Sequence, residues 1–146
     1  MMRAITVDEV HGFVYWSDLA GGKVRRATLD SSNQRDIYNV TGGGGGVGFV
    51  DGLGVNPEED KLYISDYIGR KIVVTSLDGS GGRTLITCTG YPRGLVLDLS
   101  KRLLFYSTLG PSVYKASLDG TEVTEMVSTL LGFIYGLAMN GPSRIC

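Results

Sequence analysis

Tyr15-Trp16-Ser17-Asp18 recurs twice in this 146-residue sequence, first as Tyr63-Ile64-Ser65-Asp66 and again as Phe105-Tyr106-Ser107-Thr108. The copies begin at residues 15, 63 and 105, so they are 48 and 42 residues apart. Two further series keep the same order along the chain: Gly-Leu begins at residues 52, 94 and 136, and Leu-Asp begins at residues 29, 77 and 118. Three series with one order and nearly one period predict a tandem structural repeat of about 42 residues.

Each period divides into four short segments that are rich in β-branched and aromatic residues. In the second repeat these segments are residues 52–56, 61–66, 71–76 and 83–87, and turn-forming residues separate them. The pattern predicts an all-β fold in which every repeat forms four antiparallel strands. Such a small sheet exposes two apolar faces, so we expect the sheets to stack on one another as blades of a β-propeller.

These motifs resemble the low-density-lipoprotein-receptor class B repeat, which is named after a Tyr-Trp-Thr-Asp (YWTD) motif and occurs in lipoprotein-receptor-related proteins and Wnt co-receptors. The Leu-Asp-Gly endings at residues 77–79 and 118–120 and the stretch Pro92-Arg93-Gly94 are also similar to that family. The resemblance implies an incomplete six-bladed-type YWTD β-propeller with four antiparallel strands per blade. It also implies a structural role for the motif residues, which are Tyr15, Trp16, Ser17, Asp18, Tyr63, Ser65, Asp66, Pro92, Arg93 and Gly94.

The repeat predicts how the chain is divided. Blade 1 is residues 4–51 with a Gly-rich insertion at 42–46, blade 2 is residues 52–93, blade 3 is residues 94–135, and residues 136–146 begin a fourth, truncated blade. No Lys-Ser or Lys-Thr follows the insertion, so we interpret it as a loop and not as a phosphate-binding loop. Thr108 stands where the resemblance implies an acidic residue, which predicts weaker local order in blade 3.

Three blades leave open the faces and edges that a closed ring would cover. We therefore expect either a fragment of a larger receptor-like protein or two copies that complete the ring as a homodimer. Because nothing in the sequence looks like a polar capping face, we favour the fragment. Residues 1–8 alternate in polarity as in a strand, which differs from a signal peptide, and no apolar run of about 18 residues predicts a transmembrane span.

The composition and the titratable residues argue against catalysis, metal binding and a strongly charged partner. The 14 basic and 15 acidic residues nearly cancel, so neither nucleic acid nor a membrane surface is an expected partner. His11, the single histidine, lies in an expected turn, where we interpret it as solvated or locally bonded. Asp8, Asn56, Asp98 and Asn140 follow the inner strands, and we interpret them as turn starters in preference to ligands of a central metal. We expect no catalytic residue, no metal and no cofactor.

Three features concern modification, redox state and binding. Asn39-Val40-Thr41 is a possible N-glycosylation sequon beside the insertion. The pairing of Cys88 with Cys146 is left open by the sequence. Tyr67 and Tyr135 lie outside the repeated aromatic positions and are candidates for a surface contact.

The resemblance implies a non-catalytic, protein-binding propeller segment of an extracellular or cell-surface receptor related to the low-density-lipoprotein receptor. Its expected partner is a protein ligand, including one of the Wnt pathway, or a neighbouring EGF-like module, with the membrane anchor elsewhere in the larger protein. One alternative is a matrix scaffold of nidogen type. The other is a propeller hydrolase or lyase, which would require a metal in the central channel.

Overall fold

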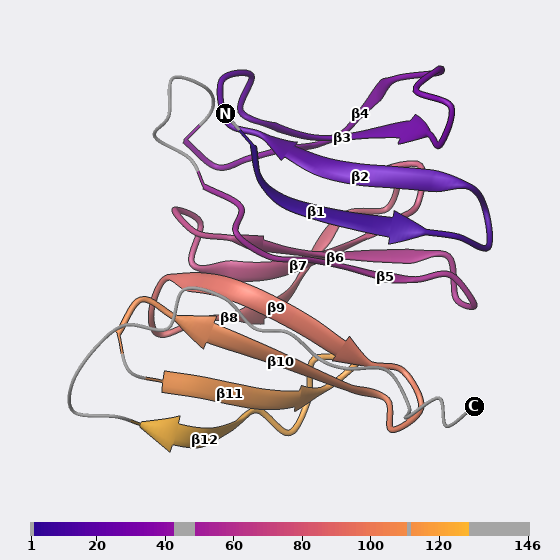
Figure 1. Cartoon of the computed structure of the whole chain (residues 1–146). Coiled ribbons are helices and arrows are strands. Elements are labelled where there is room, and N and C mark those ends of the chain that lie inside the picture. The colour runs from indigo at the N-terminus through magenta and orange to yellow at the C-terminus, as the bar shows by residue number, and fades with distance from the viewer. Residues whose placement is uncertain (1, 43–48, 111, 129–146) are drawn as a thin grey trace, which may run out of the picture.

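The computed structural model describes residues 2–42, 49–110 and 112–128, which form three four-stranded antiparallel sheets (Figure 1). The first sheet contains β1 (Met2–Asp8), β2 (Phe13–Asp18), β3 (Lys23–Thr28) and β4 (Arg35–Asn39). The second contains β5 (Leu53–Asn56), β6 (Lys61–Asp66), β7 (Lys71–Ser76) and β8 (Arg83–Thr87). The third contains β9 (Pro92–Asp98), β10 (Leu103–Thr108), β11 (Ser112–Ser117) and β12 (Thr124–Ser128). No helix that could cross a membrane occurs among these residues.

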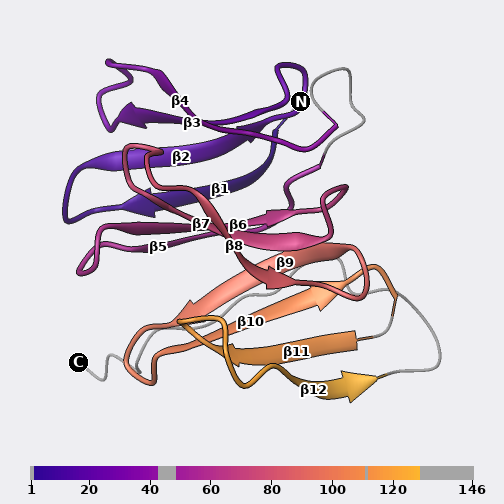
Figure 2. The same ribbon diagram turned by 180° about the vertical axis from the view of Figure 1, so that it is seen from behind.

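The sheets are stacked meanders. In each sheet the strands lie side by side in chain order, and the first strands, β1, β5 and β9, are neighbours along the stack (Figures 1 and 2). Three stacked four-stranded meanders are the arrangement of consecutive propeller blades, so the predicted all-β propeller fold is confirmed. We call the sheets blade 1, blade 2 and blade 3. The predicted fourth blade lies outside the described residues, as do residues 43–46 of the Gly-rich insertion.

The strands of the second repeat follow the prediction closely: β6, β7 and β8 coincide with the expected segments, and β5 begins one residue later, at Leu53. By contrast, β1 and β9 each begin two residues before the expected blade starts at 4 and 94. A register shift in each strand, between Met2 and Ile5 and opposite the step from Tyr106 to Thr108, explains the difference. One extra residue in the inner strand lets pairing continue beyond the Gly-Leu position.

The core lies between the blades. Side chains alternate along a strand, so Leu62 and Ile64 of β6 face blade 1 while Tyr63 faces blade 3, and all three are buried. The central strand is therefore apolar on both faces. Between blades 1 and 2 the core includes Tyr15, Val24, Ile37, Leu53, Leu62, Ile64 and Val73. Between blades 2 and 3 it includes Tyr63, Ile72, Val74, Ile86, Cys88, Leu95, Leu104 and Tyr106.

The motif tyrosine links each blade to the next. Tyr15 donates its hydroxyl hydrogen to the Leu77 carbonyl oxygen at 3.2 Å, and Tyr63 donates to the Leu118 carbonyl oxygen at 3.4 Å. Burial is the largest cause of the raised pKa of both phenols. The third copy of the motif has Phe105 at this position and lacks the hydroxyl. Each tyrosine thus connects its strand to the Leu-Asp-Gly turn of the following blade.

The glycine of the Leu-Asp-Gly turn is required for close blade packing. Gly79 and Gly120 have φ of +89° and +87°, a region that favours glycine. A Cβ at Gly79 would lie 2.5 Å from the Ile37 carbonyl oxygen, and one at Gly120 would lie 2.6 Å from that of Leu85. Each of these turns therefore packs directly on the outermost strand of the preceding blade.

Asp66, the acidic residue of the second motif copy, bonds to blade 1. One carboxylate oxygen accepts the Tyr38 hydroxyl at 2.8 Å, and the amide and hydroxyl of Thr41 at 3.1 and 2.7 Å. The other accepts the Gly69 amide at 3.1 Å within blade 2. Burial, and then the neighbouring carboxylate, raise the pKa of Tyr38. At the third copy Thr108 is buried in the equivalent place, and weaker local order of blade 3 stays a prediction.

We predict that Asp66→Ala lowers the free energy of unfolding by about 3 kcal/mol, because it leaves three buried or half-buried donors of blade 1 without their acceptor. The matched control is Asp18→Ala, since Asp18 is half-buried at the equivalent position of blade 1 and accepts the Gly21 amide. It should cost about 1 kcal/mol or less. Urea denaturation measures both values, and equal losses would contradict the inter-blade role of Asp66.

Cys88 is 6% exposed in the second core, and burial raises the pKa of its thiol to about 11. Its pairing with Cys146 lies outside the described residues. In a Cys146→Ser variant at pH 8, we predict that a thiol reagent modifies Cys88 slowly in buffer and rapidly in urea, since the thiolate is the reactive form. Equal rates in the two solvents would show that this core opens readily.

Candidate functional site

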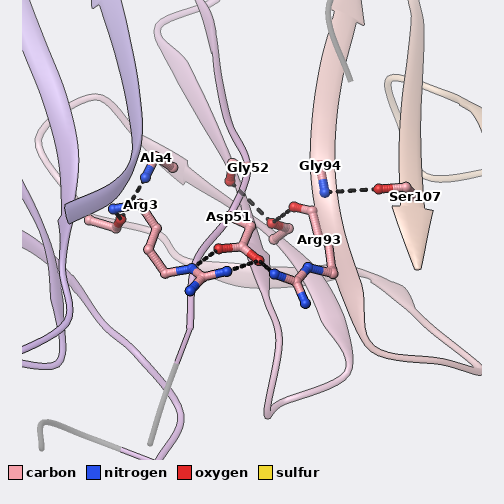
Figure 3. Close-up of polar contacts among 9 residues, drawn as sticks. Arg3, Ala4, Asp51, Gly52, Arg93, Gly94 and Ser107 are labelled. Atoms are coloured by element: carbon pink, nitrogen blue, oxygen red, sulfur yellow. Dashed lines mark hydrogen bonds and ion pairs between the residues drawn. The ribbon is translucent and has the colours of Figure 1, made fainter. Parts of the chain in front are cut away.

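The serines of the first and third motif copies hold the starts of inner strands. The Ser17 hydroxyl oxygen accepts the amides of Arg3 and Ala4 at 3.2 and 2.9 Å, and that of Ser107 accepts the Gly94 amide at 3.0 Å (Figure 3). The register shifts in β1 and β9 disturb the ladder at these amides, and a serine hydroxyl supplies the acceptor. The motif serine therefore fixes the backbone next to the first residues of the inner strand.

Blade 2 uses its serine across the blade contact. The Ser65 hydroxyl donates to the Arg93 carbonyl oxygen at 2.6 Å, which joins β6 to β9. Gly52 permits this approach, because a Cβ there would lie 2.6 Å from the Leu95 amide nitrogen and 2.7 Å from the Arg93 carbonyl oxygen. Arg93 is thereby placed beside the entry to β5.

One charged residue of each blade meets at this point. Arg3, Asp51 and Arg93 each directly precede the Gly-Leu position or its equivalent, and they stand side by side in Figure 3. One Asp51 carboxylate oxygen accepts a hydrogen bond from Arg3 Nε. The other lies 2.7 Å from Arg93 Nη2 and accepts a hydrogen bond from Arg3 Nη2 at 3.3 Å. The hydrogen bond to Asp51 is the largest cause of the raised pKa of Arg3. The side chains are 31%, 7% and 11% exposed, so the trio is fixed but reaches the surface at Arg3.

Aromatic rings continue this arrangement. Tyr67 stacks on Tyr91 with ring centroids 4.8 Å apart, and it meets Phe49 edge to face at 5.4 Å. The Arg3 guanidinium lies 5.1 Å from the Phe49 centroid, and that of Arg93 lies 5.6 Å from the Tyr67 centroid. These are cation–π distances, so the rings and the guanidiniums hold one another in place.

Arg70 completes the group. Its guanidinium lies 4.3 Å from the Tyr91 centroid and donates to the Tyr91 hydroxyl oxygen at 2.6 Å, while the residue as a whole is exposed. We call this set the Asp51 cluster; its members are Arg3, Phe49, Asp51, Tyr67, Arg70, Tyr91 and Arg93. It combines half-buried rings with three guanidiniums and one carboxylate.

The structure places the predicted site residues in different surroundings. Tyr67, predicted as a surface contact, is half-buried inside the Asp51 cluster, whereas Tyr135 lies outside the described residues. Trp16, a motif residue for which the resemblance implies a structural role, lies on the opposite face of β2 from Tyr15 and is half-buried. Asn39 is exposed at the end of β4, and Thr41 of its sequon is bonded to Asp66.

The other end of the inner strands carries turn-starting carboxylates. Asp8 accepts the amides of Val10 and His11 at 3.0 and 3.1 Å, and its second oxygen lies 2.7 Å from His11 Nδ1. Asp98 accepts the Ser100 hydroxyl at 2.8 Å and the Lys101 amide at 3.2 Å, and these hydrogen bonds, that of Ser100 first, lower its pKa. In the described part of the chain, no group of three or more His, Cys, Asp or Glu side chains could hold a metal ion.

We predict that neither EDTA nor added Ca²⁺ changes the melting temperature, because turn groups already bond to one oxygen of Asp98 and to both oxygens of Asp8. Thermal unfolding followed by circular dichroism measures this. A Ca²⁺-dependent rise in melting temperature that disappears in an Asp98→Asn variant would instead establish a metal site and revive the enzyme alternative.

Comparisons with known sequences include an informative relative. No family model matches this chain. The human protein named low-density lipoprotein receptor-related protein 5-like protein is 28% identical over 134 residues, which cover 90% of this chain and 51% of that protein. The chain therefore spans about half the length of the curated relative it matches.

Solved structures agree on the fold. The chain superposes on one from the crystal structure of a nidogen/laminin complex with a TM-score of 0.82 and 23% identity, over 92% of this chain and 51% of the other. A luciferin-regenerating enzyme gives a TM-score of 0.73 and 18% identity, over 97% of this chain and 50% of the other. One structure is named for a protein complex and the other for an enzyme. These likenesses therefore establish the propeller fold, and the function has to be inferred from the residues of the site.

Proposed function

We propose that this chain, whose three sheets are YWTD-type β-propeller blades, is a non-catalytic protein-binding segment that binds its partner through the Asp51 cluster. The observation that carries the proposal is the composition of that cluster. Tyrosine and arginine are the residue types enriched at the centres of protein interfaces, because they combine large contact area with directed hydrogen bonds. Here they come from all three blades.

The charge of the cluster favours an acidic partner. The cluster contains three guanidiniums and one carboxylate, and that carboxylate already bonds to two of them, those of Arg3 and Arg93. Arg70 is exposed and lies on the Tyr91 ring, so it remains available to an incoming carboxylate. Complementary charge would speed the encounter and orient the partner.

The cluster is also pre-organised. Arg93 and Asp51 side chains are 11% and 7% exposed, and stacking on Tyr91 restrains the ring of Tyr67. Side chains that are already ordered lose little conformational entropy when a partner binds. This supports recognition on a rigid surface, with no covalent step and no cofactor.

The relative and the structural match support two settings for this activity. The name of the human relative supports an extracellular segment of a low-density-lipoprotein-receptor-related cell-surface receptor, for which a Wnt-pathway ligand or an adjoining EGF-like module would be the partner. The nidogen/laminin structure supports the matrix-scaffold alternative. In either setting an N-glycan on Asn39 would project from the end of the outermost strand of blade 1.

Surface plasmon resonance tests the proposal with two immobilised probes, laminin and an Asp/Glu-rich peptide, and with a Lys-rich peptide as reference. We predict binding that Arg70→Glu weakens about tenfold or more, because the substitution reverses an exposed charge at the contact. Arg102→Glu is the matched control, since Arg102 is exposed and pairs with Glu59 at the opposite end of the inner strands.

Laminin binding would favour the matrix setting, and binding confined to the acidic peptide would favour the receptor setting. If the chain binds neither probe, or if the two charge reversals weaken binding equally, the Asp51 cluster is not the contact surface.

A further inference from the structure

Blade 1 has an apolar face that no described residue covers. Ile5 and Trp16 pair across β1 and β2 on the side away from the core, and Ile5 is 62% exposed. Met2, Val14 and Ala27 line a groove with them. We call these residues the open face of blade 1. Contiguous apolar side chains with exposed members, Ile5 and Met2 at 62% and 56%, indicate a contact surface.

In blades 2 and 3, the residues at the strand positions of this open face are buried against the preceding blade. Ile5, Val14 and Trp16 of blade 1 correspond in order to Leu53, Leu62 and Ile64 of blade 2, and to Leu95, Leu104 and Tyr106 of blade 3. The blade 2 set is buried against blade 1, and the blade 3 set is buried against blade 2. The open face of blade 1 is therefore the same kind of surface without its neighbour.

Blade 3 carries the other half of such a contact. Phe105, Val113 and Met126 occupy the positions of Tyr15, Val24 and Ile37, the residues with which blade 1 packs on blade 2. Phe105 and Val113 are only half-buried, and Met126 is 50% exposed. Blades 1 and 3 lie at opposite ends of the stack (Figures 1 and 2). One chain thus presents both complementary surfaces.

Although the sequence alone favours a fragment, we infer from these complementary faces that a second copy of this chain covers the open face of blade 1, with blade 3 of each copy packed on blade 1 of the other. The two contacts are identical and are related by a twofold axis, so the assembly closes and covers the exposed apolar faces that the described residues of blades 1 and 3 present. Two copies also supply about the length of the relatives, of which this chain spans 51%.

Ser31 makes this contact looser than the two within the chain. It has φ of +71° and occupies the position of Gly79 and Gly120, where a Cβ would lie 2.5 or 2.6 Å from a carbonyl oxygen of the preceding blade. In the dimer its Cβ would face the main chain beside Met126 of the second copy. Phe105 also lacks the hydroxyl that Tyr15 and Tyr63 donate to the next blade. The dimer therefore dissociates on dilution.

Analytical ultracentrifugation over a concentration series of the full chain tests this inference. The wild type should approach about twice 15.7 kDa as concentration rises. Trp16→Glu should remain monomeric, because it places a charge in the apolar contact. Val10→Glu should dimerise as the wild type does, since Val10 is 74% exposed in a turn outside the open face.

The Ser31→Gly variant should strengthen dimerisation, whereas Trp16→Glu should prevent it. The substitution does not risk misfolding, because glycine accepts the positive φ. Removal of two overpacked contacts per dimer should tighten the dissociation constant about tenfold or more. A wild type that is monomeric at every concentration, a Ser31→Gly variant without tighter association, or open chains of many copies would overturn the inference. A Trp16→Glu variant that keeps its circular dichroism spectrum and still dimerises would overturn it as well.

Discussion

The contact between neighbouring blades determines the rest of this structure, because a four-stranded sheet of this size cannot cover either of its faces. Tyr63 and Ile64 are adjacent in β6, yet they are buried in two different cores, one on each side of blade 2. Stability and shape therefore come from stacking, and each sheet depends on its neighbours. The repeated motif residues allow the blades to pack tightly. They do so through the tyrosine hydroxyl, the glycine of the Leu-Asp-Gly turn, and Gly52 of the Gly-Leu position.

The two contacts use different chemistry on the same positions. Between blades 1 and 2, Asp66 accepts hydrogen bonds from Tyr38 and Thr41. Between blades 2 and 3, Thr108 replaces the aspartate, and a thiol and a phenol, Cys88 and Tyr106, are buried together nearby. Burial raises the pKa of both groups, so both stay neutral at physiological pH. Both contacts thus contain directional hydrogen bonds, but only the first has a carboxylate at this position, and the second has neutral groups there.

The sequence predicted what depends on local pattern. The positions of β6, β7 and β8 follow from alternation and turn residues, and the stacking follows from the two apolar faces of each sheet. It did not predict the Asp51 cluster, because that cluster depends on the register shifts and on residues 48 and 42 positions apart meeting at one point. One signal was available: Arg3, Asp51 and Arg93 each precede the Gly-Leu position or its equivalent. The half-buried setting of Trp16 could not be predicted either, because the repeat identifies its strand position but cannot show that no described blade packs on that face.

The place of Arg3, Asp51 and Arg93 at the start of the inner strands has an evolutionary consequence. This position carries both signs of charge among the three blades, and Asp51 pairs with the arginines of both neighbouring blades. A change of sign in one repeat therefore has to be matched in a neighbouring repeat, because it would otherwise leave an unpaired charge on a largely buried side chain. The charges of this cluster can thus diverge through coupled substitutions while the apolar residues between the blades stay unchanged.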